Sequence, residues 1–244
     1  MIQNRLRGMS LVLALFPVYA DGVELGAQMG INFLSTPKTT DITQATVKKN
    51  RKKGFAGRVS LGYVETMGTG LLMGVHGFVG TMGGQVSVHN DQTETSKDKK
   101  KTTNAKSNFT VKQGVNTGVY GQLGVAFFGN QRFFGMAGWT LAHFSSSLDQ
   151  KIQNQLTALT SGSNTKKQWK NGISLGAGYD CGITNNVRVG LTYVATCFPG
   201  TVTNTVTLTD AKTFAHHTNA LVRRLWNHTV SVSVSVALNN KQAA

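Results

Sequence analysis

Residues 23–33 read VELGAQMGINF, and apolar side chains occupy every second position of this stretch. Because successive side chains of a β-strand point to opposite faces, the alternation predicts a strand with one apolar face. The opposite face carries Gly, Gln, Asn and one acid, Glu24. The same alternation returns at 173–183, 187–197 and 230–238, and in weaker form at 55–64, 71–80, 109–128 and 133–146. The sequence therefore predicts eight strands, of which 133–146 leaves its two faces unassigned.

The composition of the second face indicates which solvent each face meets. In a soluble β-protein the outward face is polar and usually carries Lys, Glu or Arg. Here it is mostly Gly, Ser, Thr and Asn. Such small side chains suit the interior of an eight-stranded barrel, which is just wide enough to be filled by side chains. We therefore predict that the small polar face lines a barrel and the apolar face meets lipid, with a soluble secreted barrel as an alternative.

The connections between these strands alternate in length. The short ones are 65–70, 129–132 and 184–186, and the long ones are 34–54, 81–108, 147–170 and 198–224. Structureless loops longer than about 15 residues are uncommon in compact domains, but short turns at one end and long loops at the other are typical of outer-membrane barrels. The predicted fold is an all-β, eight-stranded antiparallel up-and-down transmembrane barrel with short periplasmic turns and four long extracellular loops.

The N-terminus has the pattern of an export signal. Arg5 and Arg7 precede an apolar run at 9–18, and Val18-Tyr19-Ala20 ends the run with the small-x-small cleavage pattern. We predict a cleaved signal peptide at 1–20, a barrel domain at 21–244 and a place in the outer membrane of a Gram-negative bacterium.

The two cysteines, Cys181 and Cys197, fall at opposite ends of one predicted hairpin. The Cα atoms of a disulfide lie within about 7 Å of each other, so two free, lipid-facing thiols are expected. No cofactor or metal site is predicted, because the adjacent pair His216-His217 lacks the spacing of metal ligands.

The segments GAGYD (176–180), ITNNVRV (183–189) and LTY (191–193) resemble the penultimate hairpin of small eight-stranded outer-membrane barrels, the opacity-protein and OmpA/OmpX-like porin superfamily. The resemblance in organisation covers 21–244 and implies that fold and insertion by the barrel-assembly machinery. Members generally end in a terminal aromatic residue that this machinery reads. Here the last strand ends at Leu238 and NNKQAA follows.

Four charged residues fall on the predicted inner face. Glu24 and Arg58 lie on neighbouring strands, and Asp180 and Arg188 face each other diagonally across the 184–186 turn. Buried charges are tolerated when they are paired and hydrogen-bonded. We therefore predict an interior charge network that plugs a closed barrel, with a gate or narrow porin as the alternative.

Basic residues gather in the long connections, which hold 18 of the 23 basic and 6 of the 10 acidic residues of the predicted mature chain. Such a surface attracts anions, so we expect a structural or adhesin-like surface protein that contacts lipopolysaccharide, anionic host glycans or surface proteins. Nucleic acid is disfavoured because no aromatic residues interleave with the lysines. The residues expected to make these contacts are Lys48, Lys49, Arg51, Lys52, Lys53, Lys97, Lys99, Lys100, Lys101, Lys166 and Lys167.

An enzyme is the alternative from another class. His143 and Ser145 place a base and a hydroxyl on one face near the outward end of a strand, with Asp149 as the nearest acid. A histidine can activate a hydroxyl for nucleophilic attack, and the pair resembles that of outer-membrane lipid A deacylases. We expect a rim histidine without catalytic activity and keep a deacylase-like hydrolase as the alternative.

Overall fold

The computed structural model describes residues 22–36, 46–95, 102–127, 130–154, 160–209 and 215–238, so the predicted signal peptide at 1–20 lies outside it. The described residues form one antiparallel sheet. None of them lies in a helix long and apolar enough to cross a membrane. The strands are β1 (Gly22–Ser35), β2 (Thr46–Thr66), β3 (Leu71–Met82), β4 (Gln85–Thr95), β5 (Thr102–Phe127), β6 (Gln131–Asn154), β7 (Thr160–Gly182), β8 (Val187–Thr209) and β9 (Ala215–Ala237).

Strands β3 and β4 occupy one position in the sheet. Both pair with β2 on one side and with β5 on the other, and only Gly83 and Gly84 separate them. The Gly83 N–H donates to the Phe55 carbonyl at 2.8 Å, and the Gly84 carbonyl accepts from the Gln113 N–H at 3.0 Å. Strand β1 pairs with both β2 and β9, which closes the ring. With β3 and β4 counted as one strand, the predicted eight-stranded up-and-down barrel is confirmed.

The side chains alternate about the wall of the ring as the sequence predicts. On β1, Met29 and Ile31 are 64% and 51% exposed, whereas Asn32 is fully buried. On β2 the inward Ser60 is buried as well. The outer surface of the ring is therefore a continuous apolar band, which water would solvate poorly and lipid solvates well.

The structure also assigns the two faces of residues 133–146, which lie on β6. Phe133 and Trp139 point outward, whereas Phe134 and Met136 are buried inside. Large apolar side chains thus occupy both faces of this strand. Alternation of polarity is the signal that separates faces, and here it is missing.

The ring interior also holds large apolar side chains, which corrects the prediction that small polar residues fill it. Glycines on neighbouring strands leave room for them: a Cβ at Gly118 would lie 2.8 Å from the Phe78 ring, closer than packed carbon atoms approach. Hydroxyls fill other positions, where Thr140, Ser174 and Thr196 are linked at 2.7 and 2.8 Å. The inner apolar cluster consists of Val64, Leu72, Phe78, Tyr120, Phe134, Met136 and Val194.

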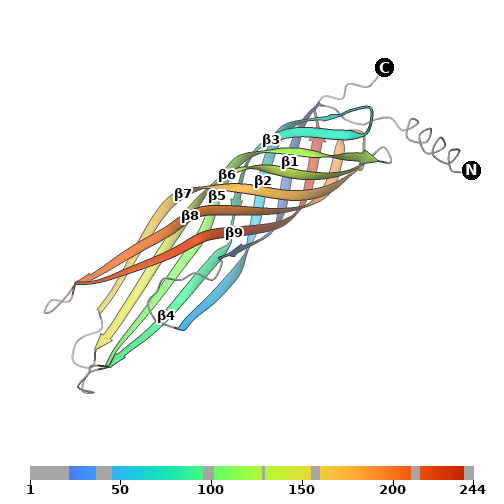
Figure 1. Cartoon of the computed structure of the whole chain (residues 1–244). Helices are drawn as coiled ribbons and strands as arrows, with labels where there is room; N and C mark the ends of the chain where they lie inside the picture. Colours follow the sequence, from blue (N-terminus) through green and yellow to red (C-terminus); the bar gives the residue numbers. More distant parts are fainter. Residues whose placement is uncertain are drawn as a thin grey trace, which may run out of the picture.

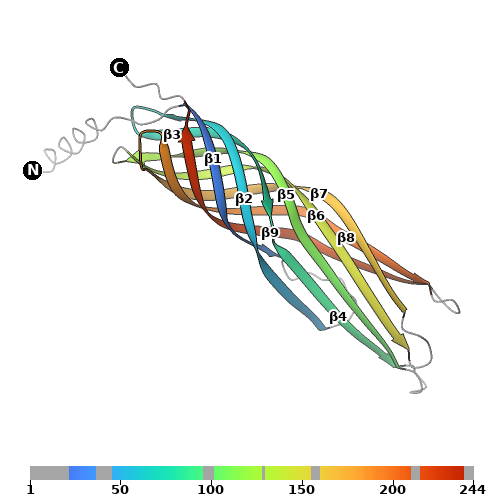
Figure 2. The same ribbon diagram turned by 180° about the vertical axis from the view of Figure 1, so that it is seen from behind.

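The prediction of four long loops is wrong over most of their length. Strands continue through them, and Figures 1 and 2 show these strands running far beyond the ring at the end opposite the short turns. The parts that lie outside the described residues are 37–45, 96–101, 155–159 and 210–214. Side chains still alternate there, but with the opposite polarity: Val86 and Val88 point inward. Because the predicted strands were defined by their outward apolar residues, each of them ended too early.

We call this part of the molecule the extension; it comprises 46–52, 85–95, 102–113, 143–154, 160–172, 198–209 and 215–225. Its strands do not close into a ring. Strand β1 ends at Ser35, opposite Trp226, and the described pairing of β7 with β8 ends at Ile173 and Cys197. Strands β2, β4, β5, β6 and β7 thus remain one sheet, while β8 and β9 leave it as a hairpin whose tip stands apart in Figure 1.

The hairpin packs against the inner face of the larger sheet. The Phe144 and Phe198 rings meet edge to face with centroids 5.0 Å apart. Asn204 Nδ2 donates to the carbonyls of Ser146 and Asn164, both at 2.9 Å. This packing encloses an apolar cluster, the outer core, which consists of Leu34, Val86, Val88, Phe109, Val111, Ala142, Phe144, Leu148, Phe198, Val202, Val222 and Leu225.

A β-bulge gives the hairpin its bend. The register of β8 against β9 shifts between Phe198 and Thr201. On β9, Arg224 has a positive φ of 52°, which is uncommon for a residue other than glycine. A bulge bends a strand and increases its local twist. The register shift lies where β8 and β9 leave the larger sheet.

Candidate functional site

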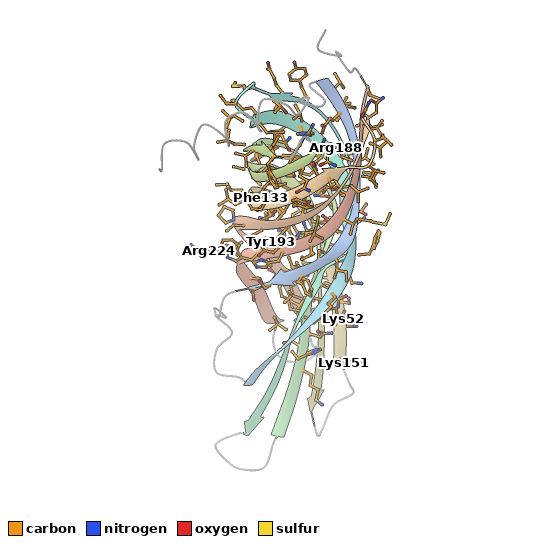
Figure 3. All side chains as sticks on the ribbon, turned by 90° about the vertical axis from the view of Figure 1, so that its right-hand side faces the viewer. Lys52, Phe133, Lys151, Arg188, Tyr193 and Arg224 are labelled. Carbon is orange, nitrogen blue, oxygen red and sulfur yellow. The ribbon has the colours of Figure 1, made fainter. Side chains whose placement is uncertain are left out.

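The outer surface changes character where the extension begins. On the ring, Phe133 and Tyr193 project outward, and Lys151 lies farther along the axis on the extension (Figure 3). At the boundary, Lys53 Nζ lies 5.4 Å from the centroid of the Phe33 ring. Lysine on a lipid-facing surface is costly, whereas apolar side chains belong there. The ring therefore suits lipid and the extension suits water.

Aromatic side chains mark this boundary. Tyr193 Oη lies 2.8 Å from His228 Nδ1, and the Trp226 and His228 rings stack with centroids 6.2 Å apart. Such amphipathic rings are typical of the girdle at a membrane–water interface. The boundary inferred from the lysines and the one inferred from the aromatic residues coincide.

The structure brings Asp180 and Arg188 together inside the ring. Arg188 Nε donates to Asp180 Oδ1 at 2.7 Å, and its Nη2 donates to the Asn130 carbonyl at 2.8 Å. Figure 3 shows Arg188 at the short-turn end. Both members of the pair sit beside the 183–186 turn, as the sequence suggested.

Glu24 and Arg58, by contrast, are not partners. Arg132 Nη1 donates to Glu24 Oε1 at 2.7 Å, and both side chains are buried. Arg132 also lies opposite Asp180 in the register of β6 with β7. The sequence placed Arg132 in a turn, so it was missed; its position one residue after Gln131, where β6 begins, is what turns it inward.

Arg58 occupies a different part of the interior. Its guanidinium Cζ lies 4.0 Å from the centroid of the Phe78 ring. A cation over an aromatic face is favourable, more so when desolvated. The predicted four-residue network therefore becomes one cluster of Glu24, Arg132, Asp180 and Arg188 at the short-turn end, with Arg58 separate from it.

The basic residues assigned to loops lie on strands wherever the structure describes them. Lys52 and Lys53 are exposed on β2, and Lys166 and Lys167 are exposed on β7. The backbone at Lys48, Lys49 and Arg51 is also part of β2, but their side chains lie outside the described residues. The other predicted contact residues lie wholly outside the described residues: Lys97, Lys99, Lys100 and Lys101.

Three further lysines, Lys106, Lys112 and Lys151, which the sequence reasoning left out, share the outer face of the extension with Lys167. Lys106 on β5 lies directly opposite Lys151 on β6. Lys112 on β5 and Lys167 on β7 flank Ser145 on β6, each as its register partner. All four lysines are exposed. The alternation of Phe109 and Val111 with polar residues was the signal that could have extended the predicted strand at 109–128 back to Lys106.

The outer face of β5, β6 and β7 in the extension is otherwise polar and uncharged over most of its area. Between the two lysine rows lie Asn108, Thr110, Ser147 and Thr165, together with one acid, Asp149, directly opposite Asn108. Neighbouring strands are about 4.8 Å apart, so Lys112 and Lys167 are separated by roughly 10 Å across the face. We call this surface, with Lys106, Lys112, Lys151 and Lys167, the lysine face.

No family model and no curated protein matches this sequence. Among solved structures, the outer membrane protein OprG from Pseudomonas aeruginosa matches with a TM-score of 0.51 and 11% identity, covering 90% of this chain and 98% of OprG. The fold is that of the small outer-membrane β-barrel proteins. Neisserial surface protein A also matches, with 13% identity, a TM-score of 0.44 and coverage of 89% and 97%. Ail, the attachment invasion locus protein of Yersinia pestis, matches with 10% identity, a TM-score of 0.36 and coverage of 88% and 99%.

In this barrel, His143 and Ser145 share the outer face of β6 and both are half-buried. The His143 ring meets Trp169 edge to face with centroids 5.3 Å apart. Asp149 accepts a hydrogen bond from Ser163 Oγ at 2.6 Å. Asp149 lies six residues along the strand from His143, which is roughly 20 Å at about 3.3 Å per residue. The structure thus brings the first two residues of the deacylase alternative to one face and separates the third.

Cys181 lies opposite Val189 and Cys197 opposite Ile173, at the two ends of the pairing between β7 and β8, and both thiols are free. Within the described ranges, no cluster of three or more His, Cys, Asp or Glu could hold a metal ion. The side chains of His216 and His217 lie outside those ranges.

Proposed function

We propose that this barrel is an outer-membrane surface protein whose lysine face binds polyanionic saccharides, either phosphorylated lipopolysaccharide or sulfated glycans. The observation that carries the proposal is the pair of lysine rows. Like charges directly opposite each other weaken a sheet, as Lys106 and Lys151 do here. An anionic chain laid across the rows would remove that repulsion.

The packing of the extension supports this role. The outer core holds the sheet behind the lysine face rigid, because its aromatic and aliphatic side chains are buried on the opposite side. A preorganised surface loses less conformational entropy on binding than a mobile loop does. Short turns of outer-membrane barrels face the periplasm, so an inserted barrel would hold the lysine face outside the cell.

The experiment is a binding titration with immobilised heparin and, separately, with vesicles that contain lipopolysaccharide or only neutral lipid. We expect binding that collapses as salt rises, because exposed charges are screened within about 8 Å at physiological ionic strength. Preference for heparin or for lipopolysaccharide tells the two saccharide sources apart.

Variants test whether the lysine face is responsible. The double change Lys112→Gln with Lys167→Gln should weaken binding by about two- to thirtyfold, since each exposed ion pair contributes about 0.2–1 kcal/mol. Arg224→Asn is the matched control: it removes one exposed charge from β9 and keeps a residue tolerant of positive φ. Equal weakening by control and double variant, or salt-independent binding, would refute the lysine face as the site.

A further inference from the structure

The lysine row nearer the ring carries three positive charges and no acid. Lys112, Ser145 and Lys167 are register partners on β5, β6 and β7. The row continues across β4 onto β2, because Gln85 pairs with Lys112 on one side and with Lys52 on the other. All three lysines are exposed. We call these five residues the inner row; charges of one sign that lie close together add their potentials.

The row farther from the ring, Lys106 with Lys151, is partly neutralised. Asp149 lies on the same strand as Lys151, two residues and so roughly 7 Å away, and its register partner is Asn108. Ser145 of the inner row is four residues, roughly 13 Å, from the same carboxylate. Opposite charges at neighbouring positions of a sheet offset each other. The inner row therefore presents the stronger positive field to an anion.

Two aromatic rings give the height of the inner row above the membrane. Trp169 is 53% exposed on the outer face, where it meets His143 edge to face, and exposed tryptophan is typical of the membrane–water interface. Ser145 lies two residues beyond His143, which for a strand tilted by about 40° is roughly 5 Å along the membrane normal. The headgroup layer is about 5–8 Å thick on each side of a bilayer.

The inner row thus lies at the level of the lipid headgroups. Lys151, eight residues beyond His143, lies roughly 20 Å above the interface by the same measure. Figure 3 shows Lys52 of the inner row nearer the ring than Lys151. Apolar side chains continue below the inner row, where Trp139 and Ile173 are register partners and both are exposed.

We propose that the inner row binds the phosphate group of a lipid A molecule in the same membrane, seated over Ser145 between Lys112 and Lys167. The inference rests on the proposed anion-binding role of the lysine face and assigns its inner row to a membrane lipid. Each lysine is a flexible stem with three N–H donors, so two of them can converge on one phosphate, and the serine hydroxyl is a further donor. The acyl chains then lie against Trp139 and Ile173, a contact that a soluble glycan cannot make.

Native mass spectrometry of the full barrel in detergent is the direct test, because it counts bound lipids and gives their Kd. The two probes are lipid A with both phosphates and the same lipid A with the phosphates removed, so that the acyl chains are identical. We expect the phosphorylated form to bind more tightly, with a difference that shrinks as salt rises. Equal Kd values for the two forms would overturn the proposal.

Paired double variants locate the site. Lys112→Gln with Lys167→Gln should weaken binding of phosphorylated lipid A by about two- to thirtyfold and leave the dephosphorylated form unchanged. Lys106→Gln with Lys151→Gln is the matched control: it removes two exposed lysines from the same face and should change neither Kd. Equal weakening by the two double variants would count against the inner row.

Heparin binding separates this site from the proposed function on which it rests. Heparin has no acyl chains, so it reports on the lysine face without the membrane lipid. Retained heparin binding together with equal affinity for the two lipid A forms would overturn the lipid site alone. Failure of the unmodified barrel to bind either heparin or lipopolysaccharide vesicles would overturn the proposed function itself.

Discussion

Inside the ring, the partner of a charged residue is set by which side chains can reach it across the interior, not by which residues are near it along the chain. Glu24 lies opposite Gly62 and Ala237 in its own register pairs, yet its partner is Arg132, which comes from a strand that does not pair with β1. The long Arg132 side chain reaches across the interior to the Glu24 carboxylate. The ion pair is thus a contact of the closed ring.

This pairing predicts an asymmetry between two arginine substitutions. Arg132→Met should lower the free energy of unfolding by about 3–5 kcal/mol, because it leaves the Glu24 carboxylate buried without a partner. Arg58→Met should cost less, since it breaks no ion pair and a methionine still packs on Phe78. Urea unfolding in lipid vesicles measures both.

A double variant serves as the control for that measurement. Glu24→Gln combined with Arg132→Met removes both charges, and replacing a whole buried ion pair by uncharged residues is often close to neutral. The double variant should therefore be more stable than Arg132→Met alone. An equal or greater loss would show that Arg132 acts through packing instead of charge.

A single strand, β6, runs through both the lipid-facing ring and the water-facing extension. Strand β6 has apolar side chains outside on the ring, at Phe133 and Trp139, and inside on the extension, at Phe144 and Leu148. Inward apolar residues occur on both the ring and the extension, with the buried hydroxyls of Thr140 and Ser146 between them, while the outward set changes from apolar to polar residues. The hairpin of β8 and β9 then covers the inward apolar residues of the extension. The same period of two thus builds a lipid-facing wall and a water-facing sandwich.

The hairpin predicts a local response to a core truncation. Phe144→Ala removes a fully buried ring that packs on Phe198, and such truncations cost about 3–5 kcal/mol. Because the ring below has its own apolar cluster, we expect β8 and β9 to separate first. Protease should cleave the hairpin faster while the ring keeps its heat-modifiable migration on a gel.

Phe133→Ala is the comparison, because Phe133 points outward from the ring on the same strand. It should leave cleavage of the hairpin unchanged. If Phe144→Ala instead abolishes folding of the ring, the extension and the ring form one cooperative unit, which would contradict the expected local response.

In the whole molecule, side chains block the interior of the barrel at both ends. The charge cluster of Glu24, Arg132, Asp180 and Arg188 lies across the short-turn end, and the outer core lies across the other. Between them, the interior is packed with aromatic, aliphatic and hydroxyl side chains. Eight strands leave just enough width for such filling.

This packing predicts that the barrel is not a pore. Purified protein inserted in planar bilayers should give no discrete conductance steps, since no water-filled path joins the two ends of a filled interior. Arg132→Ala, which removes the longest side chain of the charge cluster, is the variant in which rare openings would appear first. Steady channels from the unmodified protein would contradict the closed interior and favour a narrow porin.

Much of this architecture is local and could be inferred from the sequence. A period of two in polarity is a property of residues two apart, so strands, their outward apolar faces and the short turns follow from residues 23–33 and their counterparts. The hairpin of Asp180 and Arg188 is also local, because its turn sets the register. The basic character of the outer end was evident as well, although its lysines were assigned to loops.

What only the tertiary structure decided are the contacts made across the bore. Closure of the ring sets which side chains face each other from opposite walls, and so it joins Glu24 to Arg132, isolates Arg58 and brings Phe198 onto Phe144. Those residues lie far apart in the chain, and their distances depend on the curvature of the sheet and on where its strands stop pairing. Alternation along a strand says which face a residue occupies, but it carries no information about what stands opposite that face.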